Sequence, residues 1–135
     1  MKVVIDTNVI VAGLLSPYGP CSEIVRMVSG GLLEICFDAR IIAEYREVLG
    51  RSKFGFDPGN VSVLLDYIER YGDLTAPAPL KGSLPDKDDE AFLEASISSR
   101  AVCLITGNLA HFPEDSRQGV IVLSPSQFLS YFKTT

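Results

Sequence analysis

Side chains that could bind a metal ion occur in four separate segments of the chain. The segments are Asp6-Thr7-Asn8, the region of Glu44, Asp86 to Asp89, and Thr106-Gly107-Asn108. Grouped carboxylates repel one another and resist ionisation unless a cation holds them together. Oxygen ligands without an accompanying set of cysteines or histidines favour Mg²⁺ or Mn²⁺. Such a cation can polarise a phosphoryl oxygen and lower the pKa of water, which is the chemistry of phosphodiester hydrolysis.

Short apolar runs that alternate with helical patterns predict the elements that would carry these residues. We expect strands over residues 2–5, 32–37, 72–76, 102–105 and 120–123. Helices are predicted from the apolar run 9–15, over 22–28, 38–49, 61–71 and 86–100, and from residue 124 onward, with a loop over 50–60. Strands that alternate with helices are typical of a doubly wound α/β fold, here with a mainly parallel five-stranded sheet.

The predicted fold brings the four segments toward one edge of the sheet. In open α/β sheets, ligands bind beyond the carboxyl ends of the strands. Asp6 would follow the first strand directly, and Thr106 would follow the fourth. Glu44 lies on the helix after the second strand, and Asp89 lies near the start of the helix before the fourth. All four could therefore face the same crevice.

Four stretches of the sequence also resemble the four motifs of PIN domains. They are VVIDTNVIVAGLLS, IIAEYREVL, LPDKDDEAFLEAS and LITGNLAHF. Their order and spacing agree with that family from residue 2 to about residue 112. The similarity is greatest to the VapC-like branch, which is described as the toxins of toxin–antitoxin pairs. The resemblance implies a PIN-like fold, which we expect to occupy residues 1–135 as a single domain.

The resemblance also implies roles for individual residues. Asp6 would be the central metal ligand, with Glu44 and Asp89 as the second and third acids of a catalytic set. Thr7 and Asn8 would orient Asp6 or contact the substrate phosphate. The implied cofactor is Mg²⁺ or Mn²⁺.

The fourth motif departs from the common pattern of the family. Asn108 stands where many members have an aspartate, so this catalytic position could bind a metal or water but brings no charge. We therefore favour one metal centred on Asp6 over a two-metal site. Asp86 is the next candidate ligand after Asp89, and Asp86 and Thr106 are expected on the substrate side of the site.

Each of these residues also has a purely structural interpretation. Asp6 could be a turn residue, and Glu44 a solvated helix acid. The acids from Asp86 to Asp89 could serve only the helix start, where the helix dipole favours negative charge; we expect Asp88 to face solvent or to act as a cap. Asn108 could be a helix N-cap.

The histidine and the basic residues near the second motif have structural interpretations that we favour. His111, the only histidine, is expected to be structural beside Phe112, with phosphate contact or proton transfer as the alternative. Arg46, Arg51 and Lys53 are expected to be solvated charges, with contact to an RNA backbone as the alternative.

These features together predict a metal-dependent endoribonuclease that hydrolyses RNA phosphodiester bonds. The resemblance implies the toxin of a type II toxin–antitoxin pair, a cognate antitoxin whose C-terminal segment lies in the active-site groove, and a homodimer. The alternative is a catalytically weak PIN-like module that binds RNA or protein. A DNA-directed nuclease stays open. An aspartyl phosphatase is disfavoured because Asn8 stands where that chemistry needs a second aspartate.

Composition sets the outer limits of this hypothesis. The 135 residues are 47% hydrophobic, enough for a core. A net charge of −5 and a pI near 4.8 argue against an extended nucleic-acid surface, although bound cations would reverse the local potential. No apolar run reaches the roughly 18 residues of a membrane span, and no signal peptide is apparent, so we expect a cytoplasmic protein. The three cysteines are expected to be buried free thiols.

Overall fold

Five short strands form one sheet in the order β3-β2-β1-β4-β5, and β1 lies at its centre. The computed structural model describes residues 1–135. The strands are β1 (Lys2–Ile5), β2 (Glu34–Phe37), β3 (Asp73–Leu74), β4 (Cys103–Ile105) and β5 (Val122–Leu123). All four pairings are parallel, so the predicted α/β class is confirmed and the sheet is wholly rather than mainly parallel.

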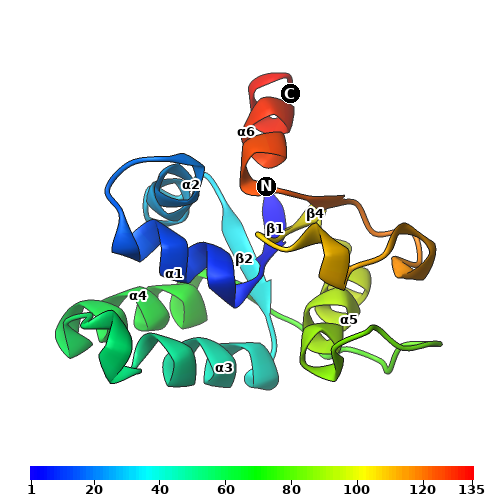
Figure 1. Ribbon diagram of the computed structural model, residues 1–135, viewed down its shortest axis with the longest axis horizontal. Coiled ribbons are helices and arrows are strands. Elements are labelled where there is room, and N and C mark those ends of the chain that lie inside the picture. The colour runs from blue at the N-terminus through cyan, green and yellow to red at the C-terminus, as the bar shows by residue number, and fades with distance from the viewer.

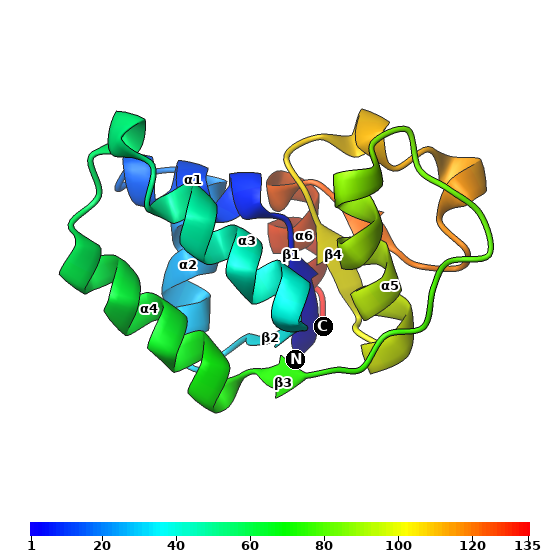
Figure 2. The same ribbon diagram turned by 90° about the horizontal axis from the view of Figure 1, so that it is seen from below.

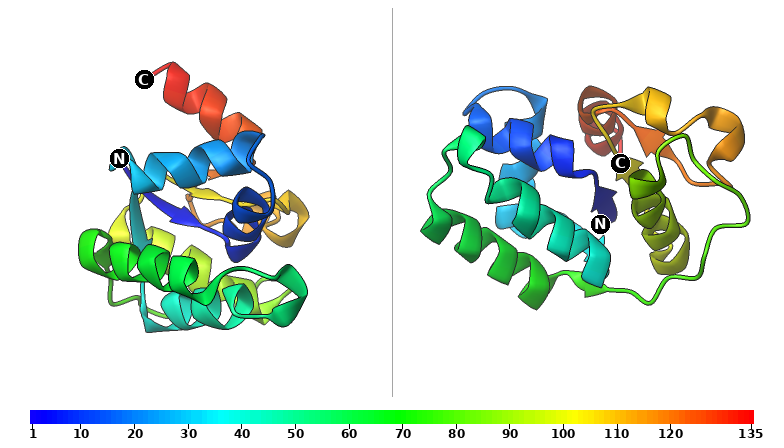
Figure 3. Two further views of the ribbon diagram at one scale, coloured as in Figure 1. Left: turned by 90° about the vertical axis from the view of Figure 1, so that its left-hand side faces the viewer. Right: turned by 60° about the horizontal axis from the view of Figure 1, so that its bottom comes forward.

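Helices cover both faces of the sheet, which gives three layers (Figures 1 and 3). α2 (Pro20–Ser29) and α6 (Pro125–Lys133) lie on one face, and α3 (Ala39–Leu49), α4 (Pro58–Tyr71) and α5 (Glu90–Ser99) lie on the other. α1 (Thr7–Leu15) continues from the end of β1 and packs against both α2 and α3. No helix is long and apolar enough to cross a membrane.

The central strands are apolar on both faces because helices cover both faces. Val3, Val4 and Ile5 of β1 are at most 1% exposed, and Leu104 and Ile105 of β4 are fully buried. Such strands show a continuous apolar run instead of alternation, which is why the sequence indicates them clearly. The apolar faces of α2 and α4 belong to the core, through Ile24, Val28, Val61, Leu65 and Ile68.

Helix caps explain where several elements begin. The Asp38 side chain accepts hydrogen bonds from the backbone N–H groups of Arg40 and Ile41, and so starts α3 as predicted. α4 begins at Pro58, within the predicted loop, because Asp57 caps its first turn and proline suits that position.

Four strands are shorter than predicted, and β4 loses only its first residue. The second begins at Glu34 instead of residue 32, since the N–H groups of Leu32 and Leu33 both donate to the Met27 carbonyl at the end of α2. β3 and β5 keep only two residues each. All three cysteines are free thiols; Cys36 and Cys103 are buried, whereas Cys21 is only partly buried.

The end of β1 is fixed by two hydrogen bonds from other elements. The backbone N–H of Asp6 donates to the Ile105 carbonyl at 2.9 Å, which extends the β1–β4 ladder by one residue. The Tyr45 hydroxyl, on a fully buried side chain of α3, donates to the Ile5 carbonyl. The residue that follows the strand is therefore held in place from both sides.

Removing the Tyr45 hydroxyl should weaken the whole fold. We expect Tyr45→Phe to lower the free energy of unfolding by about 1–2 kcal/mol, because a buried hydrogen bond is lost without a change in packing. Urea denaturation would measure it. Tyr71→Phe, on an exposed residue of α4, is the matched control and should leave the midpoint unchanged. Equal effects of the two substitutions would contradict this assignment.

Candidate functional site

A cleft of about 390 Å³ opens at the carboxyl edge of the sheet, between α1, α3 and the start of α5. Five carboxylates from three parts of the chain line it: Asp6, Glu44, Asp86, Asp88 and Asp89. The opposite wall is apolar and is formed by Val11, Leu15, Val48 and Phe54. The structure thus brings the three predicted metal ligands, Asp6, Glu44 and Asp89, to one cleft. The cleft lies at the strand-order reversal next to β1, where ligands bind in such sheets.

Asp6 lies at the bottom of this cleft and is only 5% exposed. Its Oδ2 atom accepts a hydrogen bond from the Thr106 hydroxyl at 2.8 Å and a longer one from the Asn8 amide at 3.4 Å. Burial raises the pKa of Asp6, although the hydrogen bonds from Thr106 and from the Thr7 and Asn8 backbone oppose that shift. These hydrogen bonds favour the ionised form of the buried carboxylate, and that form can bind a cation.

Thr7 and Asn8 connect Asp6 to its neighbours in ways that the sequence did not reveal. The Thr7 hydroxyl donates to Oε2 of Glu44 instead of orienting Asp6. Asn8 accepts a hydrogen bond from the Gly107 N–H at 3.1 Å and so ties the start of α1 to the end of β4. The Gly107 position has little room, since an added Cβ would lie 3.2 Å from the Asn8 amide oxygen.

The fourth segment contributes through Thr106 more than through Asn108. The fully buried Thr106 hydroxyl accepts a hydrogen bond from the Asn108 N–H at 3.0 Å while it donates to Asp6. The Asn108 side chain does not line the cleft. It also makes no side-chain cap to the short 3₁₀ turn Leu109–His111 that follows, so the capping alternative is not supported either.

The third segment places Asp89 in the cleft and Asp86 at its rim. Asp86 is exposed and caps the 3₁₀ turn Lys87–Asp89 by accepting from the Asp88 N–H at 3.0 Å. The cap is therefore Asp86, whereas Asp88 is exposed as predicted. Asp89 is 8% exposed, and its buried Oδ2 atom is paired with Nδ1 of His111 at 2.9 Å.

Placing several carboxylates in one cleft raises their pKa values. Burial, followed by the charge of Asp6, raises the pKa of Asp89 to about 6, although His111 opposes the shift. Burial also raises the pKa of Glu44, and the charges of Asp6 and Asp88 add to the shift while the Thr7 hydroxyl opposes it. A divalent cation relieves both this mutual repulsion and the cost of burying carboxylates, so these residues fit one.

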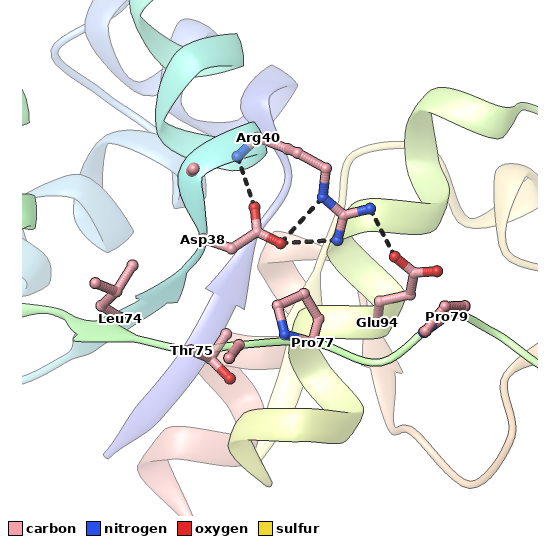
Figure 4. A pocket seen from close by; sticks show the side chains of 9 residues that line it. Asp38, Arg40, Leu74, Thr75, Pro77, Pro79 and Glu94 are labelled. Carbon is pink, nitrogen blue, oxygen red and sulfur yellow. Dashed lines mark hydrogen bonds and ion pairs between the residues drawn. The ribbon is translucent and has the colours of Figure 1, made fainter.

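A larger cavity of about 750 Å³ lies elsewhere, between the start of α3 and the segment after β3 (Figure 4). Its charged groups are already paired, because the Arg40 guanidinium donates to Asp38 at 2.8 Å and to Glu94 at 2.7 Å. Pro77, Pro79 and other small apolar groups form much of the remaining wall. This cavity therefore offers no free group for chemistry, despite its size.

Glu94 is a positioning residue that sequence reasoning missed. It joins α5 to α3 through Arg40, and it also accepts a hydrogen bond from the segment that precedes Asp86. That segment runs along the outside of α5 (Figure 2) and donates three backbone N–H groups to side chains of the helix. The bonds join Leu84 to Glu90, Leu80 to Glu94 and Ala78 to Ser98. Residues 90, 94 and 98 lie on one face of the helix, and this regular spacing is the sequence signal that could have indicated the contact.

The basic residues near Glu44 are mostly paired with acids. Arg46 contacts Glu69 at 2.7 Å, and Arg51 contacts Glu47 at 2.8 Å. Lys53 lies over the ring of Phe54 in the apolar wall, with its ammonium 5.1 Å from the ring centre. The solvated interpretation therefore fits Arg46 and Arg51, and Lys53 is the cation near the cleft.

Buried carboxylates at the strand-order reversal of a parallel sheet define an α/β protein with a candidate divalent-metal site. The chain belongs to the PIN domain family, whose model matches residues 2–110. PIN domains are typically metal-dependent nucleases, and the acidic cluster of such a site is present here. No curated protein and no solved structure shows a significant match to the chain.

The repulsion among the acids predicts that removing one charge stabilises the metal-free protein. The pKa of Asp89 is about 6 in the folded protein, whereas its ordinary value is 3.8. The protonated form of Asp89 is therefore the form that favours folding. The charged form of Asp89 therefore lowers the free energy of unfolding, and this loss is complete above pH 6. The loss disappears as the pH falls toward 4. We expect Asp89→Asn to raise the free energy of unfolding by about 1–2 kcal/mol at pH 7.5 in EDTA, after allowance for solvent screening.

Thermal denaturation in EDTA at pH 7.5 and pH 4.5 would measure this difference. The gain should be present at the higher pH and nearly absent at the lower one. Asp66→Asn, on an exposed residue of α4, is the matched control. A loss of stability in Asp89→Asn at pH 7.5 would refute the electrostatic account.

Proposed function

We propose that this PIN-domain protein is a metal-dependent endoribonuclease that hydrolyses RNA phosphodiester bonds. The observation that carries the proposal is the convergence of Asp6, Glu44 and Asp89 in one cleft. It is supported by the burial of Asp6 and Asp89, because acids that are buried close together are stabilised by a hard cation. An arrangement that served only helix capping or turn formation would not need three partly or fully buried acids from separate segments.

The proposed site residues divide into metal-holding and orienting groups. Asp6, Glu44 and Asp89 would hold Mg²⁺ or Mn²⁺, which supplies polarisation of the phosphate and acidification of water when bound. Thr106 orients the Asp6 carboxylate, and Thr7 orients that of Glu44. These hydroxyls keep the acids in fixed rotamers, so the cation and the substrate meet a preorganised set of oxygens.

Further parts of the proposal concern the substrate side of the site. Asp86 and Asp88 stand at the exposed rim, where a phosphodiester chain would pass, and Asn8 lies beside Asp6. Lys53 and Phe54 offer a cation and an aromatic face at the opposite wall. Aromatic faces stack unpaired bases, which favours single-stranded RNA over a duplex.

The toxin role, a cognate antitoxin and a homodimer belong to the same proposal. The resemblance of the four motifs to the toxin branch supports all three. An antitoxin segment in the cleft would have to match an acidic floor and an apolar wall, that is, a basic residue among apolar ones. On α4, Val63 and Tyr71 are exposed apolar side chains that a second copy of the chain could cover.

Loss of a metal-holding acid should abolish RNA cleavage. We expect Asp6→Asn and Glu44→Gln each to lower the rate of Mn²⁺-dependent cleavage of single-stranded RNA by more than about 100-fold, since even residues that only support metal ligands contribute 10–100-fold. Asp66→Asn should cleave like the unmodified protein, and EDTA should stop all cleavage. Full cleavage by Asp6→Asn would overturn the nuclease assignment.

A catalytically weak binding module is the second candidate, and the uncharged Asn108 favours it. Calorimetric titration with Mn²⁺ separates the two candidates. Binding that depends on Asp6 and accompanies cleavage supports the enzyme. RNA binding without cleavage, unaffected by Asp6→Asn, supports the module.

The toxin role makes a separate prediction in living cells. Induced expression should arrest bacterial growth, and Asp6→Asn should remove the arrest because it removes cleavage. Co-expression of the protein encoded by the adjacent gene should restore growth. Growth arrest by Asp6→Asn at equal protein level would show that the arrest does not come from RNA cleavage.

A further inference from the structure

His111 lies beside the acids of the third segment. Its Nδ1 atom is 2.9 Å from Oδ2 of Asp89, and its side chain is 43% exposed. One ligand atom each of Asp86, Asp89 and His111 lies within 4.8 Å of the others. The three residues thus form a mixed nitrogen–oxygen set of possible ligand atoms.

The 3₁₀ turn Leu109–His111 puts the imidazole there. The turn starts directly after Asn108, and the His111 N–H donates to the Asn108 carbonyl at 3.1 Å. Asn108 brings neither a charge nor a side chain to the cleft. The fourth segment therefore places an imidazole nitrogen three residues beyond the position of its amide.

The geometry around Asp89 is compatible with a shared cation. Oδ2 of Asp89 is buried and lies 2.9 Å from Nδ1 of His111. Adjacent ligand atoms of an octahedral ion with bonds of about 2.1 Å lie about 3 Å apart. The separation of 2.9 Å between this nitrogen and this oxygen matches that spacing.

We propose that His111 is a metal ligand, acting with Asp86 and Asp89, and that it makes the site prefer Mn²⁺ and related transition ions to Mg²⁺. Imidazole nitrogen suits first-row transition metals, whereas Mg²⁺ prefers oxygen and retains water. The inference rests on the metal site of the proposed nuclease and deepens it, because it names the class of cation. The competing arrangement has His111 orient Asp89 through a hydrogen bond without touching the metal.

Pulsed electron paramagnetic resonance of bound Mn²⁺ separates the two arrangements directly. We expect nitrogen coupling in the unmodified protein and its loss in His111→Gln. Titration should show Mn²⁺ affinity falling about 10-fold or more in that variant, with a change of less than about threefold for Mg²⁺. Thermal denaturation in EDTA would show that the variant is folded, and Asp66→Asn is the matched control.

Two outcomes would overturn the inference. The first is the absence of nitrogen coupling in the unmodified protein, and the second is an equal loss of Mn²⁺ and Mg²⁺ affinity in His111→Gln, which would make His111 an orienting residue. Neither would affect the proposed function if Asp6-dependent RNA cleavage persists. Nitrogen-coupled Mn²⁺ without any RNA cleavage would support the inference and remove the nuclease proposal instead.

Discussion

Repulsion among carboxylates at the end of a buried strand is the constraint around which this structure is organised. Asp6 and Asp89 are almost fully buried, and Glu44 is partly buried in the same cleft. Without a cation such a group favours protonation, and the raised pKa values of all three follow from burial first. Hydroxyl groups oppose these pKa shifts, because Thr106 donates a hydrogen bond to Asp6 and Thr7 donates one to Glu44.

The same constraint explains why distant parts of the chain are tied so firmly. β1 is held at its end by the Tyr45 hydroxyl and by the continued ladder to β4, so Asp6 cannot move away from its neighbours. α3 carries Glu44, and α5 follows directly after Asp89. The separation of these two helices is set by Arg40, which lies between Asp38 and Glu94. Asp38 and Glu94 are themselves nearly buried, and the shared guanidinium makes that burial tolerable.

The fold and the set of acids could be predicted because their signals are local. The apolar runs of β1 and β4, the capping Asp38 and the four motifs each occupy a few consecutive residues. Contacts between distant residues leave no such trace: Arg40 and Glu94 are 54 positions apart. The position of His111 beside Asp89 could not be predicted, because the 3₁₀ turn that places it there has no distinctive sequence pattern.

Net charge finally links substrate binding to metal binding. A protein with a charge of −5 and an acidic cleft repels a polyanion unless the cleft is neutralised. Few cations nearby could take over that task, because Arg46 and Arg51 are already paired with Glu69 and Glu47. Under the proposed function, the cation held by the acids would therefore be needed for RNA to approach as well as for hydrolysis.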